Sequence, residues 1–264
     1  MAAYYLAVDI GASSGRHILG HMENGKMVLE EIYRFENGMV KKDGELCWEF
    51  DRLFQEIKNG LKKCKEIGKI PVSMGVDTWG VDFVLMDKDD KVLGNTVGYR
   101  DHRNEGMDEE VYKTISLEDL YARTGIQKAI FNTVYQLMAV KTKHPEYLEQ
   151  AETMLHVPDY FHYLLTGKKT CEYTEATTGQ LVNAETKDWD YELIDKLGYP
   201  RKMFQKLIMP GTSVGHFTEE VKAEVGFDVE VVAPATHDTG SSCSSCKRRR
   251  FYLYQLRNMV IDGN

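Results

Sequence analysis

Residues 8–16 decide the fold class of this chain, and they read Val8-Asp9-Ile10-Gly11-Ala12-Ser13-Ser14-Gly15-Arg16. The apolar run at residues 4–10 predicts a buried strand, and the glycine-bounded stretch after it predicts a tight turn. Such a turn lets backbone N–H groups approach phosphate oxygens, while two serines add hydroxyl donors and Arg16 adds charge. Asp9, at the strand end, would hold Mg²⁺ through water. An ordinary glycine hairpin explains the same residues, and this alternative stays open.

The residues that follow predict strands on both sides of one helix. Residues 16–22 and 26–35 have a strand pattern and flank Asn24-Gly25, which is a good hairpin signal. The predicted order is β-β-β-α-β, with the first strands antiparallel and the fourth reached through a helix. Later strands are predicted at residues 72–77, 81–86 and 229–233, and later helices at residues 134–143, 159–165 and 191–197.

Composition restricts the class of protein. With 264 residues, of which 42% are hydrophobic, the chain can form one large domain or two small ones. It has no apolar run long enough for a transmembrane helix and no basic leader typical of a signal peptide. Five scattered cysteines suit a reducing compartment, and a formal charge of −8 disfavours binding to nucleic acid. We therefore expect a cytoplasmic protein with neither a membrane nor a nucleic-acid partner.

Two common nucleotide-binding motifs are excluded. The loop after Asp9 is not Gly-x-Gly-x-x-Gly, and the residues after it predict a strand rather than a helix. A P-loop spacing at residues 20–26 ends in Lys26, but Met27 stands where serine or threonine is needed. Neither a dinucleotide fold nor a P-loop is expected.

A candidate sugar pocket follows the strand that ends near Asp77. The connection Thr78-Trp79-Gly80-Val81-Asp82 supplies a carboxylate for hydroxyl pairs, an aromatic face for the C–H side of a sugar ring, and a glycine for close backbone approach. A plain connection with a core tryptophan is an equal alternative. Residues 99–103 form a second polar cluster, for which a solvated loop is the simpler explanation.

A candidate catalytic base lies after the last predicted strand. Asp238 follows His237 and precedes Thr239-Gly240, so it stands at a strand end before a glycine turn. An aspartate in that place can accept the proton of an attacking hydroxyl, which is the main proton transfer in phosphoryl transfer. His237 would bind a substrate hydroxyl. A helix N-cap explains the same residues and stays open.

These segments together resemble the FGGY carbohydrate kinases, which share the actin- and hexokinase-like (ribonuclease H-like) fold. The resemblance runs in order through residues 4–242. Within the family, residues 75–85 are similar to the L-rhamnulose kinases, whereas xylulose kinases carry a different segment in place of Thr78-Trp79-Gly80. The further matching segments are residues 8–16, 131–137, 158–161, 172–178 and 237–239.

The resemblance implies a fold, a reaction and residue roles. It implies an α/β lobe whose mixed sheet is flanked by helices, with helical insertions. Asp238 would deprotonate O1 of L-rhamnulose, so that ATP and Mg²⁺ give L-rhamnulose 1-phosphate. Another ketose, such as L-fuculose or xylulose, and a non-catalytic sugar-binding lobe are the alternatives. The implied contacts are Ala12, Ser13, Ser14, Gly15 and Arg16 with ATP, Asp9 with the metal, and Trp79, Gly80, Asp82, His237 and Thr239 with the sugar.

The last residues differ from the rest of the chain. Residues 243–264 hold five basic residues and one acidic residue, and Cys243 and Cys246 have no second pair beside them that would indicate a metal site. Family members continue for another lobe, so we expect a sugar-binding domain at residues 1–242 and an atypical tail, consistent with a shifted reading frame near residue 242. The expected consequences are weak ATP binding, little turnover and a tendency to form homodimers.

Overall fold

The structure is a computed structural model that describes residues 3–238 of the chain. The predictions made for Thr239 and for residues 243–264 lie outside the described residues. No helix within residues 3–238 is long and apolar enough to cross a membrane.

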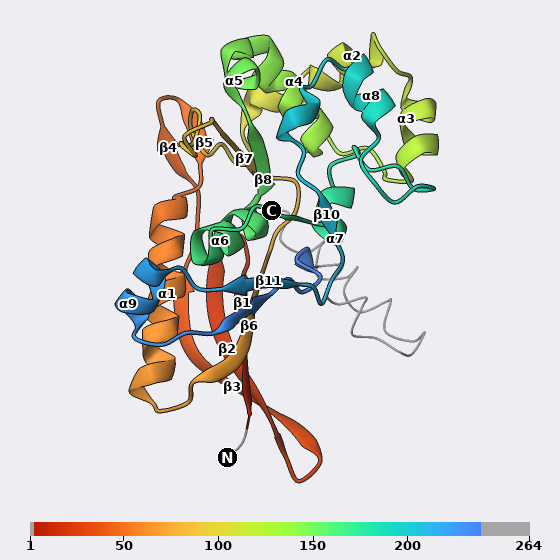
Figure 1. The fold of residues 1–264 in the computed structure, drawn as a ribbon. Helices are drawn as coiled ribbons and strands as arrows, with labels where there is room; N and C mark the ends of the chain where they lie inside the picture. The colour runs from red at the N-terminus through yellow and green to blue at the C-terminus, as the bar shows by residue number, and fades with distance from the viewer. Residues whose placement is uncertain (1–2, 239–264) are drawn as a thin grey trace.

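A six-stranded mixed sheet carries the site (Figure 1). The strands lie in the order β11-β12-β6-β1-β2-β3, and β6 runs parallel to both β1 and β12. The other neighbours, including β1 with β2 and β2 with β3, are antiparallel. The strands are β1 Tyr4–Ile10, β2 Ser14–Glu23, β3 Lys26–Glu36, β6 Pro71–Thr78, β11 Ser213–His216 and β12 Glu230–Val232.

The predicted hairpin joins β2 and β3. Asn24 has φ of 50° and Gly25 has φ of 76°, so both turn residues are left-handed. This pair of conformations matches the right-handed twist of the flanking strands, which is why Asn-Gly is favoured there. The prediction from the sequence is confirmed.

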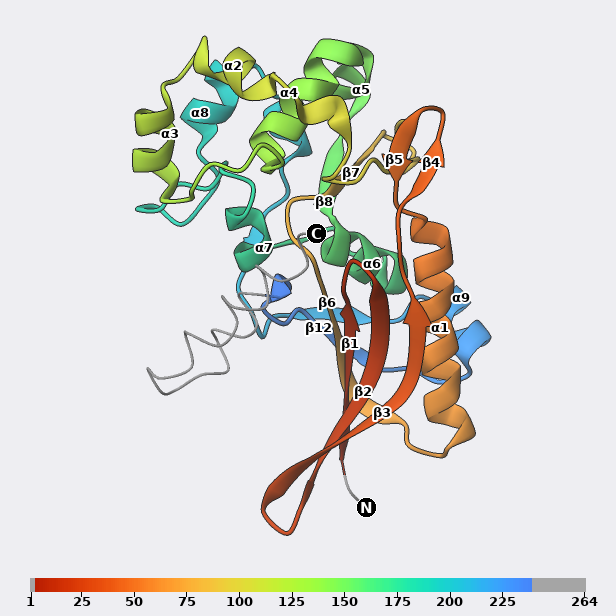
Figure 2. The ribbon, with the colours of Figure 1, turned by 180° about the vertical axis from the view of Figure 1, so that it is seen from behind.

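Three helices cover one face of the sheet (Figures 1 and 2). These are α1 Phe50–Glu66, α6 Val157–Thr166 and α9 Glu219–Val225. Their apolar side chains share one core with β1 and β6, where Val8 and Val76 are fully buried. The alternation of strand side chains places Asp9 and Asp77 on the opposite face from Val8 and Val76.

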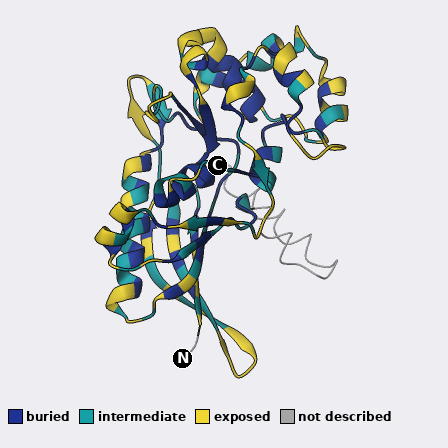
Figure 3. Ribbon diagram, viewed as in Figure 1, coloured by how far each residue is buried: buried dark blue, intermediate teal, exposed yellow. Residues whose placement is uncertain are grey.

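A second body rich in helix lies beyond one end of the sheet (Figure 1) and has its own core. The antiparallel pair β7 Phe83–Met86 and β8 Thr153–His156 lies between the two cores, and Figure 3 shows it buried. The strand predicted at residues 81–86 is present but shorter, because it begins at Phe83, and it pairs with β8 outside the main sheet.

The remaining elements complete the predicted mixed α/β architecture with helical insertions. The short strands are β4 Val40–Lys42, β5 Glu45–Cys47, β9 Cys171–Glu172 and β10 Leu207–Ile208. The helices are α2 Met107–Tyr112, α3 Leu117–Thr124, α4 Thr133–Lys143, α5 Pro145–Gln150, α7 Tyr173–Thr177 and α8 Tyr191–Lys196, with 3-10 turns at His102–Asn104 and Arg201–Met203.

Candidate active site

Three aspartates meet at the carboxyl ends of neighbouring strands. The parallel register of β1 and β6 pairs Asp9 with Asp77, and the next step along β6 pairs Thr78 with His237. Asp238 therefore arrives beside the other two carboxylates. One carboxylate oxygen from each of Asp9, Asp77 and Asp238 lies within 4.8 Å of the others. The structure thus brings together the predicted metal residue and the predicted base.

Asp77 belongs to this group, although sequence analysis did not assign it a role. The signal that identifies it is the strand register, because Asp77 occupies on β6 the position that Asp9 occupies on β1. Residue pattern alone does not give that register. The group consists of Asp9, Asp77 and Asp238, and we call it the aspartate triad.

The aspartate triad brings three carboxylates close together, so each disfavours the ionisation of the others. Burial, followed by the carboxylates of Asp77 and Asp9, raises the pKa of Asp238 from 3.8 to about 8. Burial and the Asp9 carboxylate raise the pKa of Asp77 to about 7. Arg16 lies at the edge of the group, where its Nε donates to Asp9 Oδ2 at 2.9 Å. One arginine cannot neutralise three carboxylates, so the group is suited to a divalent cation.

The loop before β2 is shorter than predicted, because Ser14 already belongs to that strand. Gly11 N–H donates to the Ser14 carbonyl oxygen at 2.9 Å, which closes the turn. Ser13 and Arg16 are exposed, and Arg16 contacts the aspartate triad through Asp9. Gly15 has a structural reason to be glycine, since a Cβ there would overlap the Phe35 ring. Contact between ATP and residues 12–16 stays a prediction.

The connection after β6 passes close to the base. A Cβ on Gly80 would lie 3.1 Å from Thr178 Cγ2 and 3.3 Å from His237 Cδ2, so Gly80 brings the backbone against both residues. The next residue, Val81, has φ of 71°, which is a strained conformation for a β-branched side chain. Such strain is typical of functional sites when the surroundings hold it in place.

Buried hydrogen bonds of Trp79 and Asp82 fix the conformation of this connection. The Asp82 side chain is fully buried, and its Oδ2 accepts hydrogen bonds from Trp48 Nε1 at 2.7 Å and Trp79 Nε1 at 2.9 Å. Gln136 Nε2 donates to the other carboxylate oxygen at 3.0 Å. The Trp48 and Trp79 rings lie 4.0 Å apart between centroids. Both predicted sugar contacts, Trp79 and Asp82, therefore have internal partners, and their contact with sugar stays a prediction.

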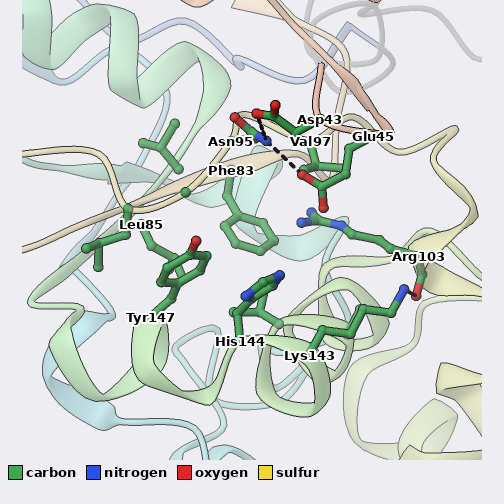
Figure 4. Close-up of a pocket in the computed structure, with 15 residues that line it drawn as sticks. Asp43, Glu45, Phe83, Leu85, Asn95, Val97, Arg103, Lys143, His144 and Tyr147 are labelled. Carbon is green, nitrogen blue, oxygen red and sulfur yellow. Dashed lines mark hydrogen bonds between the residues drawn. The ribbon is translucent and has the colours of Figure 1, made fainter. Parts of the chain in front are cut away.

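A separate cavity of about 430 Å³ contains none of the predicted site residues. It opens beside β7 and is lined by apolar side chains such as Phe83 and by the polar side chains of Glu45, Arg103 and Tyr147 (Figure 4). Arg103 links this cavity to the segment after β6. Its Nη2 donates to Gln136 Oε1 at 3.0 Å, and Gln136 in turn donates to Asp82.

Comparison with known proteins gives the family. The family model for the FGGY family of carbohydrate kinases, N-terminal domain, matches residues 4–243. A rhamnulokinase of Halalkalibacterium halodurans is 57% identical over 90% of this chain and 51% of its own length. A rhamnulokinase of Oceanobacillus iheyensis is 49% identical over 94% of this chain and 53% of its own length. The chain thus spans about half the length of the curated relatives it matches.

Solved structures confirm the fold. A xylulose kinase from Lactobacillus acidophilus superposes with a TM-score of 0.77 at 20% identity, over 89% of this chain and 48% of its own. A gluconate kinase from the same organism gives a TM-score of 0.78 at 20% identity, over 90% of this chain and 48% of its own. The predicted actin- and hexokinase-like fold class is therefore confirmed. The chain belongs to the FGGY family of carbohydrate kinases and carries the N-terminal domain of that family.

Proposed function

We propose that this domain provides the sugar site and the catalytic base of an ATP-dependent kinase that phosphorylates L-rhamnulose at O1. The aspartate triad supports the proposal, because Asp238 lies beside two further carboxylates and the adjacent His237 lies against Gly80. The choice of L-rhamnulose is supported by 57% identity to a rhamnulokinase, against 20% identity to a xylulose kinase of the same fold.

The chemistry gives the three carboxylates two roles. Asp238 accepts the O1 proton as O1 forms its bond to the γ-phosphorus of ATP and the bond to the β–γ bridging oxygen breaks, which releases ADP. A base with a pKa near the working pH suits this transfer, and the pKa of Asp238 is raised to about 8. Asp9 and Asp77 offer the oxygen ligands that Mg²⁺ prefers, and bound Mg²⁺ would neutralise phosphate charge.

The sugar specificity can be tested by calorimetry on the 264-residue chain with L-rhamnulose, L-fuculose and D-xylulose. We expect saturable binding of L-rhamnulose at one site and at least tenfold weaker binding of the other two ketoses. Tenfold corresponds to about 1.4 kcal/mol, a difference that one or two unpaired hydroxyl contacts supply.

A pair of glycine variants locates that binding. Gly80→Val fills the space beside Thr178 and His237, so it should abolish binding of L-rhamnulose. Gly38→Val is the matched control, because a Cβ at Gly38 meets nothing within 4 Å. Equal binding by both variants, or a preference for D-xylulose, would contradict the proposal.

A further inference from the structure

The segment at residues 172–178 contributes only Thr178, beside Gly80, to the site described above. It begins at Glu172, which caps α7 by accepting hydrogen bonds from the backbone N–H groups of Thr174 at 2.9 Å and Glu175 at 3.2 Å. Glu172 is fully buried, so its carboxylate must be satisfied by protein groups. The Glu172 carboxylate can accept more hydrogen bonds than the cap provides, and it accepts them from a residue outside the helix.

The same carboxylate of Glu172 reaches the segment after β12 that carries the base. Glu172 Oε2 accepts a hydrogen bond from the Thr236 backbone N–H at 3.1 Å and another from the Thr236 hydroxyl at 2.9 Å. Thr236 precedes His237, and its carbonyl oxygen accepts from the backbone N–H of Thr78 at 3.0 Å. Glu172 therefore fixes the backbone two residues before Asp238 and, through Thr236, the end of β6.

Glu175, the other acidic residue of the segment, holds the Gly80 connection. Glu175 Oε1 accepts from the Val81 backbone N–H at 3.1 Å, and the Thr178 hydroxyl contacts the same N–H at 3.1 Å. The Thr133 hydroxyl donates to the Val81 carbonyl oxygen at 2.7 Å. These bonds hold Val81 in its left-handed conformation, which would otherwise be costly.

We propose that Glu172 and Glu175 are positioning residues that clamp the two halves of the site together. Glu172 holds the segment after β12 that carries the base, and Glu175 holds the Gly80 connection. This inference rests on the proposed function, since it explains how the Gly80 connection and Asp238 are held in contact. Neither glutamate transfers a proton in the reaction. Both act through the backbone that they hold, and α7 fixes the spacing between them.

The clamp predicts a change confined to the segment that carries the base. Glu172→Gln leaves one acceptor oxygen where Glu172 has two, so the hydrogen bonds to the Thr236 N–H and hydroxyl should weaken and amide hydrogen exchange at residues 236–238 should become about tenfold faster. Glu175→Gln is the matched control. It keeps an acceptor oxygen for the Val81 N–H, and it should leave exchange at residues 236–238 unchanged.

A second variant tests the contact without removing a charge. Thr236→Val deletes the hydroxyl donor and keeps both the shape and the backbone N–H. It should speed amide hydrogen exchange at residues 236–238 by about tenfold, because the hydrogen bond from the hydroxyl to Glu172 Oε2 is lost, whereas Thr236→Ser keeps the hydroxyl and should not. This variant decides the question if Glu172→Gln does not fold.

The sugar assay separates this inference from the function on which it rests. We expect Glu172→Gln and Thr236→Val to weaken L-rhamnulose binding at least tenfold in calorimetry. If the unmodified chain does not bind L-rhamnulose, the proposed function fails, and the exchange measurements still decide the clamp. Unchanged exchange at residues 236–238 in folded Glu172→Gln, or in Thr236→Val, would overturn the clamp.

Discussion

At the scale of single residues, the carboxylates of the aspartate triad serve the proposed reaction but lower the stability of the folded protein. Three carboxylates that lie within 4.8 Å repel one another, and burial adds to the cost of charging them. Sequence patterns predicted Asp9 and Asp238, because Asp9 lies at the end of one predicted strand, Asp238 follows another, and each precedes a glycine turn. Asp77 was missed because its importance depends on the register between β1 and β6, which no local pattern specifies.

Asp238→Asn should stabilise the protein at alkaline pH. The folded state raises the pKa of Asp238 from 3.8 to about 8, so it keeps a proton that the unfolded chain releases between these values. Stability therefore falls as pH rises through this window, and an uncharged amide avoids the loss. We expect a Tm several degrees higher than that of the unmodified protein at pH about 8 and no difference near pH about 4, since 1 kcal/mol corresponds to about 2–4 °C.

Asp190→Asn is a control for which we expect the opposite change in Tm. Burial alone would raise the pKa of Asp190, but hydrogen bonds from Arg123 and other donors lower it overall. Its stabilising effect is present above its ordinary pKa, so the variant should lower Tm at pH about 8. An Asp238→Asn variant that is also less stable at that pH would show that the carboxylates do not repel one another.

At the scale of elements, helix α1 shows why packing can overrule propensity. Gly60 lies within the helix, where alanine would normally be more stable by about 1 kcal/mol. A Cβ on Gly60 would overlap the ring of His17, whose Nε2 lies 3.1 Å from the Ile57 carbonyl oxygen. The glycine is therefore required by the approach of β2 to the helix.

Gly60→Ala should destabilise the protein by about 1–3 kcal/mol, because overpacking displaces the buried His17 ring. Urea unfolding measures the loss. The double variant His17→Ala with Gly60→Ala should lose less than the sum of the two single variants, since the first change makes room for the second. A stabilised Gly60→Ala variant would contradict the described packing of β2 on α1.

Elements with strong local signals were predicted well, and pairings distant in sequence were not. The Asn24-Gly25 turn, the strand at β12 and the helices α4, α6 and α8 follow from turn chemistry and apolar spacing. The partner of β7 lies about seventy residues further along the chain, at β8, and depends on tertiary packing. The contacts of Glu172 with Thr236 were likewise not predictable from either segment alone.

At the scale of the whole molecule, the pair β7 and β8 joins the two hydrophobic cores. Val84 and Met86 belong to the core under the sheet, whereas Phe83 and Leu85 belong to the core of the helical body. The alternation of side chains along a strand produces this division. Because the same strand serves both cores, neither core can open without disturbing the other.

Leu85→Ala and Met86→Ala should each lower the free energy of unfolding by about 2–5 kcal/mol, as expected for a buried side chain truncated in a packed core. Both variants should still unfold in one transition by fluorescence and by circular dichroism. Met27→Ala, at a side chain that is 68% exposed, is the control and should change stability little. Two separated transitions in either variant would show that the cores are independent.

The central claim is that a ketose binds with O1 at Asp238, between the Gly80 connection and the aspartate triad. A crystal structure of the 264-residue chain with L-rhamnulose tests it most directly. We predict O1 within hydrogen-bonding distance of the Asp238 carboxylate, about 2.6–3.2 Å, with the sugar against Gly80 and His237. Sugar bound instead in the cavity beside Arg103 and Tyr147, or with O1 turned away from Asp238, would contradict the account.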